Sequence, residues 1–138
     1  MQGKAVESVL KLDHIAFENI RYSRNVNVAF ERTDIQMNFT RSIQSSEDKK
    51  NYRISLTANL WSEPKGLVSL EITAVGFFSC DCEDERLKET LVSDNAVAII
   101  FPYLRSQVSL VTTQPDLPPI TLPSMNIAAM FHENEKQE

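Results

Sequence analysis

Two adjacent segments in the middle of the chain alternate apolar and polar residues. Between Tyr52 and Trp61 an apolar side chain stands at every second position, and residues 67–78 repeat the pattern. A period of two is typical of a strand that buries one face and leaves the other in water. The sequence Glu-Pro-Lys-Gly at 63–66 has the composition of a turn. The two segments are therefore predicted to pair as an antiparallel hairpin.

Two further strands are predicted upstream of this hairpin. Residues 34–40 alternate in the same way, and the polar loop 45–50 follows them. The segment Leu10 to Ser23 is longer and richer in apolar residues, but its alternation breaks between positions 12 and 15 and again between 17 and 20. Such breaks predict bulges in a long strand, and a helix over part of the segment is a second interpretation.

Helix-forming residues dominate after the second cysteine. A short helix is predicted over 84–92, with Ser93-Asp94 as the cap of the helix that follows. The main helix is expected over about 97–113, where apolar residues recur near the helical period. Pro102 is compatible with the first turn of a helix, because its missing N–H has no partner there in any case.

The end of the chain combines a stiff segment with a last helix. Residues 114–124 contain four prolines, so this apolar stretch is expected to be extended. A final helix is predicted over about 125–133. Together these elements predict one α+β domain over 1–138, with an N-terminal extension at 1–8 and a polar tail at 132–138.

Charge and hydropathy narrow the function classes. Residues 1–65 carry 10 Lys or Arg and 8 Asp or Glu, whereas 66–138 carry 4 and 11, and the whole chain has a net charge of −5. This balance argues against nucleic acid as a partner. The first ten residues lack the unbroken apolar run of a signal peptide, and the longest apolar stretch, 96–101, is too short to cross a membrane. We therefore expect a cytoplasmic protein without membrane insertion.

The residues that usually carry catalysis are scarce. The chain has two histidines, His14 and His132, three glycines, and no motif of a nucleophile elbow, a phosphate loop or a zinc protease. Cys80 and Cys82 lack a second ligand pair at zinc-site spacing, so we expect free thiols at the end of a strand. The sequence thus predicts neither an enzyme nor a protein with a metal or another cofactor.

The C-terminal third carries a family resemblance. The sequence IIFPYLR at 99–105 resembles the ILFPYAR helix start of the SecB export chaperones. The sequence LPPITLPSMNIAAMF at 117–131 is similar to the family's FPxLxLxPVNFxALF segment. Residues 52–62 and 71–78 align with its central hairpin, and 10–23 with its first strand. The resemblance implies a four-stranded antiparallel sheet with a long helix and a C-terminal helix packed on one face.

The resemblance also implies a function. SecB chaperones are homotetramers, dimers of dimers, that hold unfolded polypeptides in apolar surface grooves for export and deliver them to the SecA motor. Flexible thioethers and aromatic rings suit such grooves, because they repack around varied clients. On this basis the client-binding residues are predicted to be Val26, Val28, Phe30, Met37, Phe39, Leu117, Ile120, Leu122, Met125, Met130 and Phe131. Each of them is equally compatible with a place in the core.

Assembly and partner surfaces follow from the same resemblance. Alternate apolar residues of the fourth strand, Leu70, Ile72 and Ala74, correspond to an oligomer contact of the family. Glu71 corresponds to an acidic residue that SecA contacts, but Asn19 and Ser23 occupy the positions of the acidic residues on the first strand. A loss of acidic residues weakens attraction to a basic partner, so docking to SecA is expected to be reduced.

Three alternatives to a general export chaperone stay open at this point. One is a SecB-like chaperone dedicated to a single partner, such as the antitoxin of a toxin–antitoxin pair. A second is a small-ligand binding protein or an enzyme of hot-dog or cystatin-like fold, since those folds also wrap a curved sheet around a long helix. A third is an interaction protein whose contacts are its sheet edges and its proline-rich segment.

Overall fold

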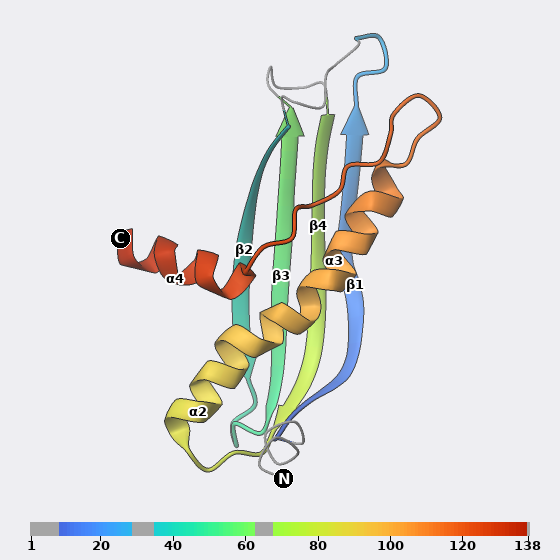
Figure 1. Cartoon of the computed structure of the whole chain (residues 1–138). Coiled ribbons are helices and arrows are strands. Elements are labelled where there is room, and N and C mark those ends of the chain that lie inside the picture. Colours follow the sequence, from blue (N-terminus) through green and yellow to red (C-terminus); the bar gives the residue numbers. More distant parts are fainter. Residues whose placement is uncertain (1–8, 29–34, 63–67, 138) are drawn as a thin grey trace.

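The chain forms a curved four-stranded sheet with its helices on one face. The computed structural model describes residues 9–28, 35–62 and 68–137, the last four by their backbone only. A long diagonal helix crosses the sheet, and the C-terminal helix projects past one sheet edge (Figure 1). The expected N-terminal extension at 1–8 and the predicted turn at 63–66 lie outside the described residues. The α+β architecture expected from the resemblance is confirmed.

All neighbouring strands run antiparallel, in the order β1-β4-β3-β2. The strands are β1 (Leu10–Arg24), β2 (Ile35–Ser45), β3 (Asn51–Ser62) and β4 (Val68–Cys80). β3 pairs with β4 as the predicted hairpin. β1 is a strand throughout and not a helix, and its register against β4 shifts between Leu12 and His14 and again between Phe17 and Asn19. The two predicted bulges therefore lie where the alternation breaks.

The first three helical segments form one continuous rod with a π-helical turn inside it. The rod consists of α2 (Glu85–Thr90), the π-helix η2 (Leu91–Asn95) and α3 (Ala96–Thr112). Asp84 caps its start, since its carboxylate accepts hydrogen bonds from the backbone N–H groups of Arg86 and Leu87. The predicted cap at Ser93-Asp94 is wrong, because both residues lie within the π-helical turn. Pro102 is likewise inside α3 and not in the first turn of a helix.

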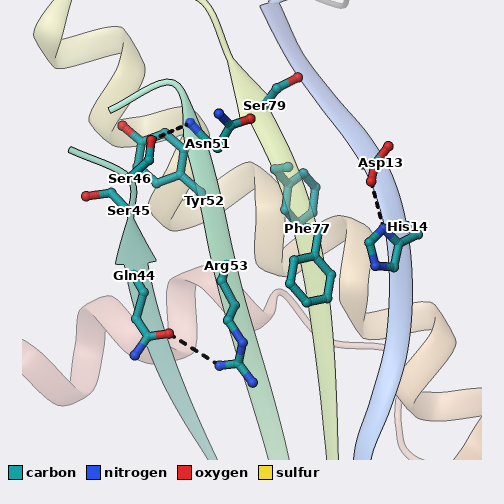
Figure 2. A pocket seen from close by; sticks show the side chains of 11 residues that line it. Asp13, His14, Gln44, Ser45, Ser46, Asn51, Tyr52, Arg53, Phe77 and Ser79 are labelled. Carbon is teal, nitrogen blue, oxygen red and sulfur yellow. Dashed lines mark hydrogen bonds and ion pairs between the residues drawn. The ribbon is translucent and has the colours of Figure 1, made fainter. Parts of the chain in front are cut away.

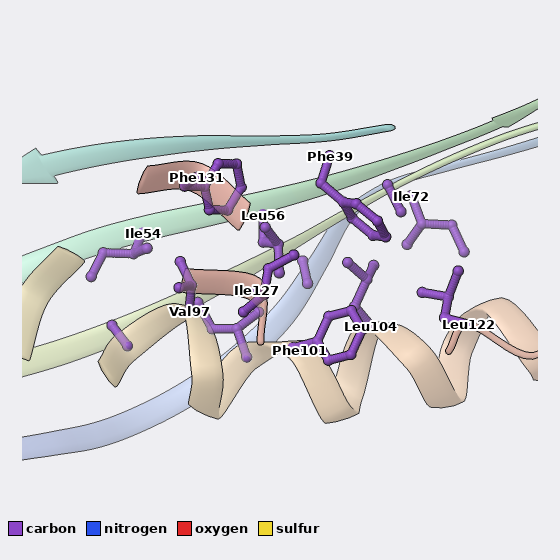
Figure 3. Close-up of a cluster of buried hydrophobic side chains, with 14 of the residues drawn as sticks. Phe39, Ile54, Leu56, Ile72, Val97, Phe101, Leu104, Leu122, Ile127 and Phe131 are labelled. Atoms are coloured by element: carbon purple, nitrogen blue, oxygen red, sulfur yellow. The ribbon is translucent and has the colours of Figure 1, made fainter. Parts of the chain in front are cut away.

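The core lies between the rod and the inner faces of β3 and β4. Figure 3 shows Ile54, Leu56 and Ile72 pointing from the sheet toward α3. Burial of each such side chain contributes about 1.5–3 kcal/mol to folding. Gly76 on β4 allows the helix to approach closely, since an added Cβ would lie 2.5 Å from the Phe78 ring and 3.0 Å from Ile100. A side chain at position 76 would therefore push β4 and α3 apart.

The segment 113–126 leads back across the helical layer to α4 (Ile127–Gln137). Its backbone is held by α3: Thr112 Oγ1 accepts a 2.8 Å hydrogen bond from the Ile120 N–H and donates one to the Val108 carbonyl. At its outer end Asp116 accepts a 2.7 Å hydrogen bond from Arg24, which lowers the pKa of the Asp116 carboxyl. These contacts hold the extended segment in place, because its backbone cannot form the regular hydrogen bonds of a helix or a sheet.

Replacing Thr112 with Val is expected to destabilise the fold by about 1–3 kcal/mol, because Val keeps the shape but leaves the buried Ile120 N–H without an acceptor. Urea unfolding followed by circular dichroism measures the change. Thr121→Val removes the same atoms at an exposed site and should change stability by less than about 0.5 kcal/mol. Equal stability of the two variants would contradict this role for Thr112.

Candidate interaction surfaces

Five of the predicted client-binding residues are buried within the chain. Phe39 packs edge-on against the ring of Phe101, with centroids 6.0 Å apart, and Figure 3 shows both rings between the sheet and α3. The buried five are Phe39, Leu117, Ile120, Leu122 and Phe131. Their packing in one chain accounts for their apolar character. A client contact for them stays a prediction, and it would require the helices or the 113–126 segment to move.

The other predicted client-binding residues keep surface in contact with water. Val26 and Val28, which follow β1, are 80% and 41% exposed. Three methionines pack only partly against the core: Met37, Met125 and Met130. Phe30 lies outside the described residues. The apolar surface available for a client therefore comes from the chain after β1, from β2 and from the ends of the 113–126 segment and α4.

A pocket of about 830 Å³ opens between α3 and residues 121–127. Phe101 and Pro102 line it from α3, and Met125 and Ile127 line it from the other side. Apart from Ala98, its remaining lining is polar and includes Arg105, whose guanidinium donates a 3.5 Å hydrogen bond to Ser124. An aromatic ring, a thioether and an adjacent cation offer adaptable contacts, and none of these groups is arranged for catalysis.

A second apolar surface lies along β1 and the adjacent flank of α3. The rod crosses β3 and β4 and reaches β1 with its C-terminal turns (Figure 1). The inward side chains of β1 are half-buried or exposed. Ile20 on β1 is 44% exposed, and Tyr103 and Leu110 on α3 are 50% and 67% exposed. Helical spacing puts Tyr103 and Leu110 on the flank opposite the 830 Å³ pocket. We call these three residues, with the half-buried Ile15 and Phe17, the β1–α3 surface.

The predicted oligomer residues are part of the core. Leu70, Ile72 and Ala74 lie on the inner face of β4 and are at most 1% exposed. Their burial is complete within one chain, beneath α3. Their place in an oligomer contact stays a prediction, whereas the β1–α3 surface is apolar and open. The exposure of Ile20, Tyr103 and Leu110 could not be predicted from the sequence, because residue spacing does not tell which flank of a helix its neighbours leave uncovered.

The outer face of the sheet is polar and balanced in charge. Glu71 on β4 faces outward opposite Arg21, and Asn19 and Ser23 share that face. Glu18 forms an ion pair with Arg53 across the intervening strand. Among the described residues this face carries three acidic and three basic side chains: Asp13, Glu18, Glu71, Lys11, Arg21 and Arg53. It therefore lacks the net negative charge that attracts a basic partner.

An aromatic pocket of about 600 Å³ lies at one end of the outer face (Figure 2). The His14 ring stacks on Phe77 with centroids 4.4 Å apart, and His14 Nδ1 lies 2.7 Å from the Asp13 carboxylate. Arg53 donates a long hydrogen bond of 3.4 Å to Gln44 beside them. Among the described residues, His14 forms a hydrogen bond to Asp13 and none to a serine of the pocket lining, so this arrangement fits docking better than catalysis.

Neither the thiols nor the other titratable groups of the described residues form a metal site. Cys80 is buried at the end of β4, Cys82 is half-buried, and both are free. Burial raises the pKa of the Cys80 thiol, which keeps it protonated and unreactive at neutral pH. No three His, Cys, Asp or Glu side chains in the described ranges gather closely enough to hold a metal ion. Within the same ranges, no helix is long and apolar enough to cross a membrane.

Comparisons with known proteins agree on one family. The family model described as "Preprotein translocase subunit SecB" matches residues 8–138. An uncharacterized protein of Methanocaldococcus jannaschii is 27% identical over 132 residues, covering 92% of this chain and 85% of that protein. The protein-export protein SecB of Ehrlichia chaffeensis is 25% identical over 127 residues, covering 81% of this chain and 73% of that protein.

A solved structure repeats the fold. A SecB-like chaperone of Mycobacterium tuberculosis, in complex with a ChAD peptide from an antitoxin, superimposes with a TM-score of 0.69. The match covers 89% of this chain and 92% of that one, at 12% sequence identity. At this level of sequence identity, the similarity shows that the two chains share the same arrangement of strands and helices.

Proposed function

Because this chain belongs to the SecB family, whose members are chaperones and not enzymes, we propose that it is a holdase that binds unfolded or nascent polypeptides. The observation that carries the proposal is the open pocket of about 830 Å³ beside α3, which Phe101 lines from α3 and Met125 lines from the other side. An aromatic ring and a flexible thioether accept apolar client side chains of different shapes without a fixed pattern of hydrogen bonds. Val26 and Val28 add exposed apolar side chains in the segment that follows β1.

We propose export as the role of this holdase, with a dedicated partner as the second candidate. The second candidate is supported by the outer face of the sheet, where Glu18 and Glu71 lie next to Arg53 and Arg21 and the charges cancel. A surface without net charge steers a basic motor such as SecA weakly. A M. tuberculosis relative of the same fold binds an antitoxin peptide, which makes an antitoxin the first partner to test.

We also propose that the chain assembles through its β1–α3 surface, as a homotetramer built from two dimers. Ile20, Tyr103 and Leu110 expose large apolar side chains on neighbouring elements. Apolar patches of this kind on a small domain are typical of interfaces. β1 is also an edge strand, so two copies that meet there cover an edge that is open in the single chain.

Suppression of aggregation tests the holdase proposal. Several unrelated proteins are diluted from denaturant with and without the chain, and light scattering follows their aggregation. A holdase lowers scattering for all of them in proportion to its concentration, whereas a dedicated chaperone protects one cognate client from its own cells. Failure with every client, including polypeptides recovered by pull-down from those cells, would refute the proposal.

Replacing Val26 and Val28 together with Ser is expected to weaken client binding about 3- to 10-fold, because two exposed apolar contacts are lost. Both side chains are solvent-exposed, so the fold should be retained. Fluorescence anisotropy with a labelled unfolded client measures the affinity. The matched variant Val26→Ile/Val28→Ile keeps the apolar surface and should bind as the wild type does. Unchanged binding by the Ser variant would remove these valines from the client surface.

A further inference from the structure

The segment 113–126, which we call the strap, buries apolar side chains but forms little backbone pairing. Its residues Leu117 and Ile120 are 5% and 6% exposed. Within the described ranges, no backbone-to-backbone hydrogen bond joins residues 118–125 to a helix or a strand. Figure 1 shows the strap leaving the end of α3 near the arrowhead of β1 and running back across the sheet to α4. A segment held by so few backbone hydrogen bonds opens at a smaller free-energy cost than the core.

The four prolines make the strap a stiff unit, because each fixes a φ angle and removes an N–H donor. At its outer end, Gln114 and Leu117 pair with each other across Pro115 and Asp116. Two backbone hydrogen bonds of 3.2 Å close this tight turn. A stiff segment loses little conformational entropy when it closes, so a small number of contacts decides whether it stays closed.

Hydrogen bonds at two places join residues 115–120 to other elements of the described chain. In the middle of the strap, the Ile120 N–H donates to Thr112 at 2.8 Å, and Ser109 donates to the Ile120 carbonyl at 3.2 Å. At the tip, the Arg24 guanidinium donates to the Asp116 carboxylate at 2.7 Å. Thr112 and Ser109 belong to α3, from which the strap itself emerges, whereas Arg24 belongs to β1. The ion pair therefore ties the tip of the strap to the sheet.

The two partners of this ion pair differ in their surroundings. The Arg24 side chain is 12% exposed, whereas that of Asp116 is 69% exposed. The hydrogen bond from Arg24 lowers the pKa of the Asp116 carboxyl, which keeps it charged at neutral pH. Water can hydrate the exposed carboxylate when it leaves the pair, and a pair of this kind contributes only modestly to stability. The strap can thus break this contact without unfolding the sheet.

The apolar side chains of the strap differ in their relation to the core. Leu117, next to Asp116, is buried but lies outside the main core cluster. Leu122, nearer to α4, belongs to that cluster and is completely inaccessible. Ile120 lies between them in the chain. Opening of the outer half of the strap would therefore uncover Leu117 and Ile120, while Leu122 stays in the core.

We propose that the Arg24–Asp116 ion pair is a latch that keeps the strap closed. When the latch is released, the outer half of the strap opens and adds Leu117 and Ile120 to the client surface. This inference rests on the proposed holdase function and concerns its regulation. Val26 follows Arg24 by two residues and is 80% exposed, so the uncovered side chains lie near apolar surface that is already open. The closed form is a resting state that reduces the exposed apolar area when no client is bound.

Replacing Asp116 with Ala removes the carboxylate and tests the latch. The side chain is largely exposed, so the fold should be retained. Hydrogen exchange in peptides that span 113–126, followed by mass spectrometry, should be about 3- to 10-fold faster than in the wild type. An unfolded client should bind about 3- to 10-fold more tightly in fluorescence anisotropy, because its apparent affinity rises with the population of the open form.

Two further variants separate the latch from a general effect of charge. Asp116→Glu keeps a carboxylate at the tip of the strap and should exchange and bind as the wild type does. Glu18→Ala removes a carboxylate from the ion pair with Arg53 on the outer face of the sheet. This variant loses the same charge away from the strap and should leave both the exchange of 113–126 and the client affinity unchanged.

The outcomes separate the latch from the function on which it rests. Unchanged exchange in Asp116→Ala would overturn the latch, and so would equal acceleration in Glu18→Ala. Faster exchange without tighter client binding would overturn the claim that the strap covers client surface. If neither the wild type nor any variant binds a client, the holdase proposal is refuted, and the exchange rates still decide for or against the latch.

Discussion

Replacing Leu70 with Asp is expected to abolish the native fold. Leu70 is 1% exposed on the inner face of β4, between the sheet and α3. The substitution removes a buried apolar side chain and introduces a carboxylate that has no partner there. Either effect costs several kcal/mol, and the stability of a whole domain is about 5–15 kcal/mol. Far-ultraviolet circular dichroism and urea unfolding should show a chain without a cooperative transition at room temperature.

The neighbouring position gives a matched control for this prediction. Ser69 points to the outer face of β4, where it is exposed. Ser69→Asp introduces the same carboxylate one residue away and should change stability by less than about 0.5 kcal/mol. A folded Leu70→Asp variant with near wild-type stability would contradict the placement of Leu70 beneath α3, and with it the assignment of the two faces of the sheet.

Replacing Ile20 and Leu110 together with Lys is expected to dissociate the assembly. The two side chains are 44% and 67% exposed in the single chain, so the fold should tolerate the change. In the proposed interface both cations would be buried without partners, which costs more than the apolar contacts contribute. Light scattering coupled to size exclusion should show the mass falling from a multiple of 15.7 kDa to 15.7 kDa.

A second flank of the same helix serves as the control for assembly. Ser106 is exposed on the flank of α3 that faces residues 121–127, and Ser106→Lys should leave the mass of the assembly unchanged. A wild type that is monomeric at micromolar concentration would contradict assembly altogether. A double variant that keeps the wild-type mass would instead move the interface away from the β1–α3 surface.

The sheet could be predicted from the sequence because its two faces differ in chemistry. Residues 52–61 alternate strictly in sequence, since one side packs under α3, and most outward side chains of β3 and β4 are half-buried, with Ser55 and Val75 buried as exceptions. The helical rod was harder to predict. Ser93 and Asp94 are common capping residues, but the π-helical turn includes them in the rod, and Asp84 caps its start instead. Local composition does not indicate a π-helical turn, because the unfavourable free energy of such a turn is offset by tertiary packing.

The client-binding residues were less predictable than the fold, because a core and an apolar groove select the same side chains. Leu122 and Ile127 are nearly inaccessible, while Val26 is 80% exposed, and nothing in their side-chain chemistry separates them. The balanced charge of the outer face of the sheet was equally hard to predict from the sequence. Glu18 and Arg53 are 35 residues apart in the chain, and only the strand order brings them together.

Each of the two bulges in β1 changes whether the even-numbered or the odd-numbered residues of the strand face the core. Leu12, Phe17 and Ile20 all point inward although their numbers do not share a parity, because each bulge adds one residue. Deleting a single residue between the two bulges would exchange inside and outside for the residues that follow, turning Arg21 inward and Tyr22 outward, whereas deleting the extra residue of a bulge would leave both faces as they are. Insertions and deletions within this strand are thus far more disruptive than substitutions, and relatives are comparable along it only where their bulges coincide.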